Sequence, residues 1–335
     1  MQSTKVRQRR IARAQRPGGP EVIEVAVEDL PEPGPGEALV RVEAAGLNHA
    51  DSLIRSGGYV VTMPFPLAVG VEAAGTVVAA GDGAGVALGS RVCGTGWLGS
   101  CADHVVVPVE RLVPIPDGLG FEEAASVAHA GAAAGALTRV WPLTGRRAAV
   151  WGAAGAVGRL LVAWLSRNGT EVIGIAGGDR VDIPALLGAA HIVDRTAGDV
   201  AVQVREATGG RGVDAVFDPV AGSTFRTSLA MLAPRGCLIN YGQLSGAVAG
   251  TEFADLFNAG GVFVTKFNAG AYVDDYADVT ALIGEALHLA VERPEVLSPV
   301  AARFPLTEAA AAYRALESGA AGKVLVVPGL SQGDG

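Results

Sequence analysis

The first third of the chain carries short runs in which apolar residues alternate with polar ones or follow one another directly. Both patterns are typical of β-strands that are half-buried or fully buried. Turn-forming clusters such as Pro31–Gly36 and Gly81–Gly83 separate these runs. We therefore expect strands at Glu21–Val27, Glu37–Ala44, Ala73–Ala79, Arg91–Thr95 and Ala102–Val107. Many short strands with turns between them predict a compact, partly closed β barrel.

From Phe121 onward the pattern changes, because apolar runs of strand length now alternate with segments of helical period. This alternation predicts a parallel sheet with helices on both of its faces. The strands are expected at Arg146–Trp151, Glu171–Ile175, His191–Val193, Ala215–Phe217, Cys237–Tyr241 and Val262–Lys266.

The last part of the chain predicts two helices, Tyr276–Glu292 and Leu306–Ser318, and a closing strand, Lys323–Val327. We expect this tail to return to the first domain. A chain of 335 residues is too long for one small core, which favours two domains. The predicted domains are residues 1–125 with 268–335, and residues 126–267.

A strand-to-helix turn in the second domain carries three glycines, Gly152, Gly155 and Gly158. A helix from Arg159 to Asn168 follows, with apolar residues on one face. Glycines at this spacing allow a tight turn, a close approach of phosphates to the backbone, and packing of the helix on the strand. The turn therefore predicts a dinucleotide site at the helix N-terminus, where free N–H groups attract phosphate. An ordinary loop rich in glycine and alanine is the alternative.

Composition and charge narrow the class of protein. Half of the residues are hydrophobic and the mean hydropathy is +0.35, yet no apolar run reaches the length of a membrane span. The net charge of −8 argues against a nucleic-acid partner, although Met1–Arg10 is basic. That segment is expected to be a frayed leader rather than a secretory signal. Three cysteines give no disulfide framework, so we expect a cytoplasmic protein.

The order of barrel, dinucleotide fold and returning tail resembles the medium-chain dehydrogenase/reductase superfamily, and within it the zinc-free quinone oxidoreductase branch that includes zeta-crystallin. The resemblance implies a GroES-like barrel domain and a Rossmann domain. It runs from about Gly18 to Pro328. Besides the glycine turn, the segments that carry it are Gly18–Val22, Pro33–Glu37, Ala45–Asp51, Gly70–Gly75, Gly89–Val92, Asp214–Val220 and Tyr241–Gly246.

The same resemblance argues against a metal site. Zinc-dependent relatives carry a cysteine where this chain has Asn48 and a histidine where it has Val71. An amide and an isopropyl group are not zinc ligands. The neighbouring His49 lacks partners, so no metal is expected.

NADPH is the expected cofactor. The second strand of the Rossmann fold ends in Ile175–Gly178 without the acidic residue that usually holds the ribose 2′-OH of NAD. Arg180 and Arg195 follow, and a guanidinium suits a 2′-phosphate. Asp179 keeps NAD open as an alternative, and either arginine could be a solvated surface charge. With the resemblance included, the expected cofactor contacts are Asn48, Gly152, Ala154, Gly155, Ala156, Val157, Gly158, Gly177, Gly178, Arg180, Arg195, Val220, Tyr241, Gly242, Gln243 and Lys323.

Few side chains are candidates for catalysis, because the nicotinamide carries the hydride. By the resemblance, Asn48 lies near the nicotinamide ribose and the substrate, whereas Asp51 is structural. Tyr59 could donate a proton or bond a carbonyl, or it could only pack. Lys266 could polarise a carbonyl oxygen from the opposite side of the cleft.

The implied activity is NADPH-dependent reduction of a quinone or an activated C=C bond by a homodimer joined through the edge strand Gly261–Phe267. Small residues at Gly131–Gly135 and Gly99–His104, where relatives carry aromatics, suggest a wide pocket. A dedicated enoyl or enone reductase of an aromatic polyketide or other natural-product pathway is therefore the alternative activity. A non-catalytic, crystallin-like NADPH-binding protein is the alternative of another class.

Overall fold

The structure, a computed structural model, describes residues 7–59 and 63–331. It contains two compact units, Met1–Ala132 with Asp275–Gly335, and Ala133–Asp274. We call them the barrel unit and the nucleotide unit. Both boundaries between the units lie seven residues beyond the limits expected from the sequence. The first boundary falls inside the continuous helix α2 (Phe121–Thr138).

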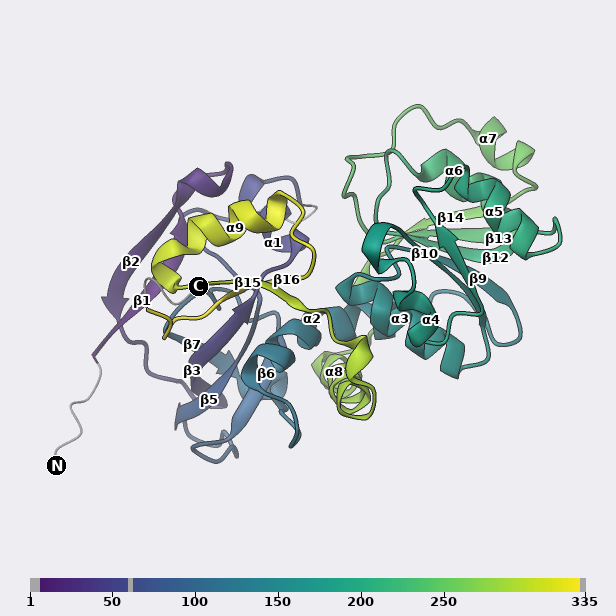
Figure 1. The fold of residues 1–335 in the computed structure, drawn as a ribbon. Coiled ribbons are helices and arrows are strands. Elements are labelled where there is room, and N and C mark those ends of the chain that lie inside the picture. Colours follow the sequence, from purple (N-terminus) through teal and green to yellow (C-terminus); the bar gives the residue numbers. More distant parts are fainter. Residues whose placement is uncertain (1–6, 60–62, 332–335) are drawn as a thin grey trace. The chain divides into compact units, whose positions relative to one another are not determined.

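The barrel unit is built mainly from short antiparallel strands (Figure 1). One sheet has the order β2-β1-β4, and a second has the order β15-β16-β3-β5-β6-β8, with β7 also pairing with β3. The strands are β1 (Gln8–Ala14), β2 (Ile23–Asp29), β3 (Glu37–Gly46), β4 (Leu67–Ala68), β5 (Glu72–Ala80), β6 (Arg91–Thr95), β7 (His104–Pro108), β8 (Val113–Pro114), β15 (Val300–Phe304) and β16 (Lys323–Val326). The helices are α1 (His49–Ser56), the first part of α2, α8 (Tyr276–Glu292) and α9 (Ala309–Glu317).

The C-terminal tail does return to the barrel. Strand β16 pairs antiparallel with β3, with Leu325 opposite Gly46 and Val326 opposite Ala45. All four residues of β16 are buried, because they lie between β15 and β3 in the sheet. The last strand of the chain is therefore an interior strand of the first unit.

The expectation of a frayed leader at Met1–Arg10 is wrong for its last residues. Gln8–Arg10 belong to β1, which pairs along its whole length with β2. Basic side chains hid this strand in the sequence, yet here they have partners: Arg9 bonds Glu28, and Arg10 bonds Asp103. Residues 1–6 of the expected leader lie outside the described residues.

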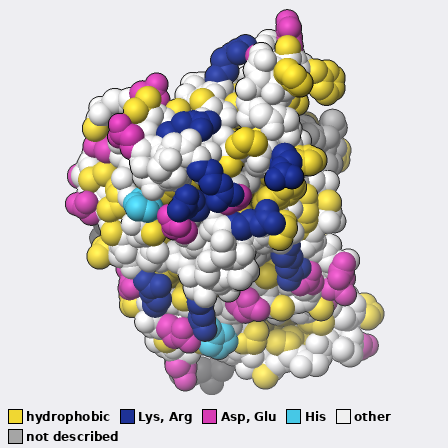
Figure 2. Space-filling model, turned by 90° about the vertical axis from the view of Figure 1, so that its right-hand side faces the viewer, with side chains coloured by type: hydrophobic (Ala, Val, Ile, Leu, Met, Phe, Trp, Pro, Cys, Tyr) yellow, Lys and Arg dark blue, Asp and Glu magenta, His cyan; other side chains and the backbone are white. Residues whose placement is uncertain are grey.

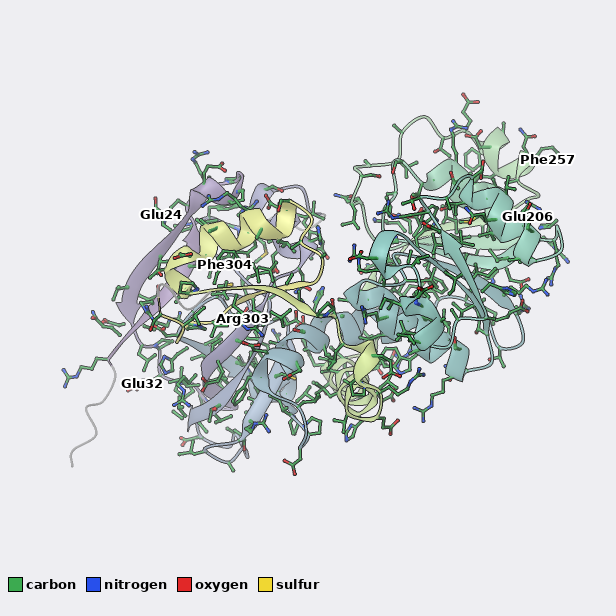
Figure 3. All side chains as sticks on the ribbon, in the orientation of Figure 1. Glu24, Glu32, Glu206, Phe257, Arg303 and Phe304 are labelled. Atoms are coloured by element: carbon green, nitrogen blue, oxygen red, sulfur yellow. The ribbon has the colours of Figure 1, made fainter. Side chains whose placement is uncertain are left out.

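The nucleotide unit holds a parallel sheet of order β11-β10-β9-β12-β13-β14. Its strands are β9 (Arg147–Trp151), β10 (Glu171–Ala176), β11 (His191–Asp194), β12 (Val213–Asp218), β13 (Leu232–Asn240) and β14 (Phe263–Lys266). Its helices are the end of α2, α3 (Ala156–Arg167), α4 (Ile183–Leu186), α5 (Val200–Ala207), α6 (Phe225–Met231) and α7 (Phe253–Asn258), with Phe257 at the outer edge of the unit (Figure 3). The strand order reverses at β9, and such a reversal creates a crevice at the carboxyl ends of the strands.

Helix α3 begins three residues earlier than the sequence pattern indicated. Gly155 is its N-cap, so Ala156, Val157 and Gly158 form the first turn of the helix. Small residues there lack the apolar periodicity from which a helix is recognised. Among the described residues, no helix is both long and apolar enough to cross a membrane.

Candidate nucleotide pocket and active site

The glycine turn joins β9 to α3 under tight steric limits. Gly152 has a φ of +64°, a left-handed conformation that disfavours residues with a side chain. A Cβ added at Gly158 would lie only 2.1 Å from the Gly152 carbonyl oxygen, so the helix could not start so close to the strand. The turn therefore needs glycine at both ends, and it leaves the N-terminus of α3 open for an anion.

A cavity of about 360 Å³ lies beside this turn. Seven of the residues expected to bind the cofactor line it, namely Gly152, Ala154, Gly155, Gly177, Arg180, Arg195 and Val220. Five further lining residues were not anticipated, namely Trp151, Ile175, Ala176, Ser223 and Thr224. The first three end the strands β9 and β10, so their position at the carboxyl edge of the sheet could have suggested them.

Basic side chains dominate the end of this pocket near β10. The Arg195 backbone N–H donates to the Ala176 carbonyl (2.8 Å), and the Arg195 side chain lies across Gly177, where an added Cβ would be 2.8 Å from Arg195 Cγ. Arg180 lines the same pocket, whereas Asp179 is exposed and does not. Arg159, missed from the sequence, donates from Nε to the Ala154 carbonyl (2.9 Å). Burial and the neighbouring Arg180 lower its pKa.

Asp218, at the end of β12, shapes the opposite wall. Its Oδ1 accepts hydrogen bonds from the backbone N–H of Val220 (2.7 Å) and Ala221 (3.1 Å). Its Oδ2 accepts from Ser228 Oγ (2.9 Å), which in turn accepts from Trp151 Nε1 (2.9 Å). This buried network fixes the position of Val220 and of the Trp151 ring in the pocket.

Other expected contacts lie near the pocket without lining it. Ala156, Val157, Gly158 and Gly178 flank its turns, and Tyr241, Gly242 and Gln243 follow β13. Gly242 packs on Pro219, since an added Cβ would be 2.3 Å from the Pro219 carbonyl oxygen.

Lys266, the last residue of β14, donates from Nζ to Asn240 Oδ1 (2.7 Å) and to the Gly242 carbonyl (2.9 Å). Burial lowers the pKa of Lys266, and Asp218 opposes this shift. Its ammonium therefore braces the ends of β13 and β14 at the carboxyl edge of the sheet.

A second cluster lies inside the barrel unit around Glu72, at the start of β5. Lys323 Nζ donates to Glu72 Oε2 (2.5 Å) and to Asn48 Oδ1 (2.9 Å). Asn48 Nδ2 also donates to Glu72 Oε2 (2.9 Å). Glu72 and Lys323 are 0% and 4% exposed, so the two charges neutralise each other away from water. Lys323, which was expected to contact the cofactor, thus donates its hydrogen bonds to Asn48 and Glu72 in this structure.

Tyr59 follows the end of α1, beyond the C-cap Gly57, and is 41% exposed. It belongs to the same unit as Asn48. Its expected position opposite Lys266 concerns two separate units and stays a prediction.

Four of the residues expected to widen a pocket lie inside the barrel unit. Ser100, Cys101 and Ala102 are fully buried, and Ser100 Oγ donates to the Glu72 carbonyl (3.1 Å). Gly131 lets α2 approach α8, because an added Cβ would lie 2.5 Å from Ala286 Cβ. These four residues therefore serve packing within the barrel unit, and the wide pocket stays a prediction.

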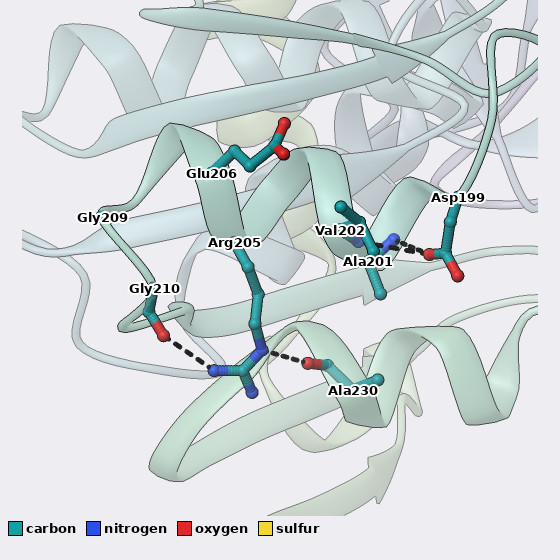
Figure 4. Close-up of a pocket in the computed structure, with 8 residues that line it drawn as sticks. All are labelled: Asp199, Ala201, Val202, Arg205, Glu206, Gly209, Gly210 and Ala230. Atoms are coloured by element: carbon teal, nitrogen blue, oxygen red, sulfur yellow. Dashed lines mark hydrogen bonds between the residues drawn. The ribbon is translucent and has the colours of Figure 1, made fainter.

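A second hollow, of about 650 Å³, lies on the surface of α5 and α6 (Figure 4). It shares no lining residue with the cavity beside the glycine turn. Its one basic side chain, Arg205, is occupied by the carbonyls of Ala230 (2.9 Å), Gly210 (2.9 Å) and Leu232 (3.1 Å). On the face in Figure 2, acidic side chains lie beside the basic ones, so that face carries no uninterrupted basic surface.

Two family matches cover most of the chain. Residues 34–117 match the alcohol dehydrogenase GroES-like domain, and residues 156–285 match the zinc-binding dehydrogenase family. A quinone oxidoreductase of Pseudomonas aeruginosa is 36% identical over 304 residues, which cover 89% of this chain and 93% of the relative. The chain belongs to the quinone oxidoreductase branch of the medium-chain dehydrogenase/reductase superfamily.

Two further relatives extend the comparison. A 2-haloacrylate reductase of a Burkholderia species is 32% identical, over 89% of this chain and 92% of the relative. The solved structure of Escherichia coli quinone oxidoreductase in complex with NADPH is 28% identical, with a TM-score of 0.86, over 95% of this chain and all of that chain. The two-domain α/β fold expected from the sequence, a GroES-like barrel with a Rossmann-like sheet, is confirmed by these matches.

The zinc in one family description does not fit the residues present. At the two ligand positions named above the chain has the Asn48 amide and the apolar Val71, and the neighbouring Glu72 carboxylate is already neutralised by Lys323. Burial raises the pKa of the Cys93 and Cys101 thiols, which disfavours the thiolate that zinc requires. Within the described residues, no group of three or more His, Cys, Asp or Glu side chains could hold a metal ion.

Asp51 holds the backbone of Asn48 in position, because its Oδ2 accepts a hydrogen bond from the Asn48 backbone N–H (2.7 Å). The same bond is part of the capping box at the N-terminus of α1. Its Oδ1 is buried and has no hydrogen-bond partner among the described residues. Burial raises the pKa of the Asp51 carboxyl from 3.8 to about 7. The folded protein therefore binds a proton that the unfolded chain releases at lower pH.

We expect Asp51 to make the stability of the protein depend on pH. A raised pKa in the folded state means that its contribution is full below about pH 4 and is lost as the pH rises through about 7. Asp51→Asn, which keeps the capping oxygen, should remove this component. Urea unfolding from pH 5 to 8 should show the wild type losing stability relative to the variant. Parallel curves would show that Asp51 does not titrate in this range.

Proposed function

We propose that this protein is an NADPH-dependent reductase that transfers hydride to a quinone or to a C=C bond activated by a carbonyl group. The main observation behind this proposal is the cavity beside the glycine turn, whose lining residues include two arginines and no acidic side chain. The relatives support this proposal, because one has NADPH bound and others are a quinone oxidoreductase and a 2-haloacrylate reductase.

In this proposal the reduced nicotinamide supplies the hydride, and the protein binds and orients it. The glycine turn and the N-terminus of α3 hold the pyrophosphate, while Arg180 and Arg195 bind the 2′-phosphate. Asn48, fixed by Glu72 and Lys323, orients the reactants. Tyr59 and Lys266 are proposed to hold and polarise the substrate oxygen through hydrogen bonds. The two compact units serve as the substrate-binding and cofactor-binding domains, and three free, buried cysteines suit the cytoplasm.

The purified protein should oxidise NADPH when supplied with an acceptor from a panel of quinones, enones and 2-haloacrylates. Loss of the absorbance of reduced nicotinamide measures turnover, and the preferred acceptor separates a quinone reductase from a dedicated enone reductase. Tight binding of NADPH with no turnover on any acceptor would favour a non-catalytic role and would refute the proposal.

Arg180 and Arg195 should select NADPH over NADH. Each charge-assisted hydrogen bond to the 2′-phosphate contributes roughly 1.5–3 kcal/mol, so Arg180→Ala with Arg195→Ala should weaken NADPH binding by roughly a hundredfold or more. The affinity for NADH should change little. Calorimetric titration measures both, and Arg211→Ala, which removes an exposed arginine paired with Asp214, is the matched control. Equal losses for the two cofactors would contradict the assignment.

We also propose a homodimer joined through β14, the edge strand of the parallel sheet. Phe263 and Val264 of this strand are exposed, although Phe263 also contacts the Trp141 ring at a centroid distance of 5.3 Å. An apolar edge strand with unpaired backbone groups associates readily with a second copy. Pairing of β14 with its two-fold mate would make one continuous sheet.

Light scattering should therefore give about twice the chain mass of 33.8 kDa at micromolar concentration. Val264→Arg should shift the protein toward the monomer, since it places a charge on the edge. Val202→Arg, on an exposed residue of α5, should not. A wild-type mass near that of one chain would rule out the dimer.

A further inference from the structure

The buried Glu72 carboxylate of the barrel unit holds three residues in place, Asn48 and Lys323 on one oxygen and His129 on the other. Glu72 Oε2 accepts from Asn48 Nδ2 (2.9 Å), and Glu72 Oε1 accepts from the backbone N–H of His129 (2.5 Å). His129 lies on α2, whereas Asn48 precedes α1. The backbone of His129 is thus held by the same carboxylate as the Asn48 amide that we propose orients the substrate.

The orientation of the His129 ring is fixed by a second contact. His129 Nδ1 lies 2.8 Å from Thr95 Oγ1, at hydrogen-bond distance. Thr95 ends β6 and is the register partner of Glu72 across the β5–β6 ladder, so both anchors of His129 sit on adjacent strands. The other ring nitrogen, Nε2, has no hydrogen-bond partner within the part of the chain that the structure describes. The half-buried ring therefore has one nitrogen held and one available.

We propose that His129 is the catalytic proton donor of the reduction, with Thr95 as its positioning residue. This inference rests on the proposed function. When hydride from the reduced cofactor adds to the electrophilic carbon of an enone, the C=C electron pair moves toward the carbonyl and leaves an enolate. The proton on His129 Nε2 passes to that enolate, and the neutral imidazole recovers a proton from water. For a quinone, the acceptor of the proton is the phenolate oxygen of the reduced ring.

The other two candidates are less well placed to release a proton. The Lys266 ammonium donates to Asn240 Oδ1 and to the Gly242 carbonyl, so transfer of its proton would disturb the ends of two strands. Tyr59 has a largely accessible side chain on the loop that follows α1. His129 differs from both, because its ring is held through Nδ1 while Nε2 has no hydrogen bond among the described residues.

The charges around His129 set the direction of its pH dependence. Burial lowers the pKa of His129, Glu72 on β5 raises it, and Lys323 on β16 lowers it. The result is a pKa below the ordinary value of 6.5. Since the protonated ring is the donor, kcat should rise as the pH falls toward this pKa and should decline at higher pH.

The central experiment compares His129→Leu with the wild type on the best acceptor of the panel. Leucine retains the backbone N–H that Glu72 binds, so the substitution removes only the ring. We expect kcat to fall by about a hundredfold, the dependence of kcat on pH to flatten, and added imidazole to restore part of the rate. The Kd for NADPH should stay within about twofold of the wild type. Thr95→Val, which removes one hydroxyl at similar volume, should give a smaller fall in kcat.

The matched control is His288→Leu, because the ring of His288 bonds only its own helix, through Nδ1 and the Gly284 carbonyl (2.8 Å), and is exposed. This control should keep the wild-type kcat and pH profile.

If His129→Leu unfolds, the same measurements are made on Thr95→Val and His129→Asn instead. A variant that folds and binds NADPH but keeps the wild-type kcat and pH profile would overturn the proposal. So would a comparable loss of the pH dependence in Tyr59→Phe or Lys266→Met with none in the His129 variants. A wild type that reduces no acceptor would instead refute the proposed function.

Discussion

The ion pair between Glu72 and Lys323 is the contact on which the barrel unit depends. Its donor and acceptor are 2.5 Å apart and both side chains are buried, so neither charge could remain without the other. The pair connects β5 to β16, which is the last strand of the chain. The same carboxylate accepts hydrogen bonds from the Asn48 amide and the His129 backbone N–H. Asn48 is the N-cap of α1 and His129 lies on α2, so these bonds also fix both helices against β5. The groups that we propose act in this unit, Asn48 and His129, are therefore both held by one buried, neutralised carboxylate.

The positive charge at this site is the ammonium of Lys323. Lys323 brings one positive charge close to the Asn48 oxygen, and the Glu72 carboxylate cancels most of its field. The arrangement can hold an amide and an imidazole in fixed positions, yet it does not provide a Lewis acid for an alkoxide. A site of this kind suits a reaction in which a cofactor supplies the hydride and the protein supplies orientation and a proton.

In the nucleotide unit, by contrast, the shape of the pocket is set mainly by how closely the backbone segments pack. Gly158 allows α3 to approach β9 at a distance that any side chain would prevent, and Gly152 adopts the left-handed conformation that the turn requires. The opposite wall depends on Asp218, whose buried carboxylate collects the N–H groups of the turn after β12. The pocket thus combines close backbone packing with one buried carboxylate in its wall, and the charged side chains that line it are Arg180 and Arg195.

Local patterns in the sequence determined most of the strands, the helices α3, α8 and α9, the glycine turn and the family, because apolar periodicity and turn residues act over a few positions. The same patterns missed β1, whose arginines look like surface charges until Glu28 and Asp103 are beside them. Only the tertiary structure decided that Lys323 meets Glu72, which lies 251 positions earlier in the chain. It also decided that His129 joins them and that the pKa of Asp51 is raised. Contacts between distant residues arise from packing, and the ionisation of a buried group depends on everything packed around it, so neither can be seen in a local pattern.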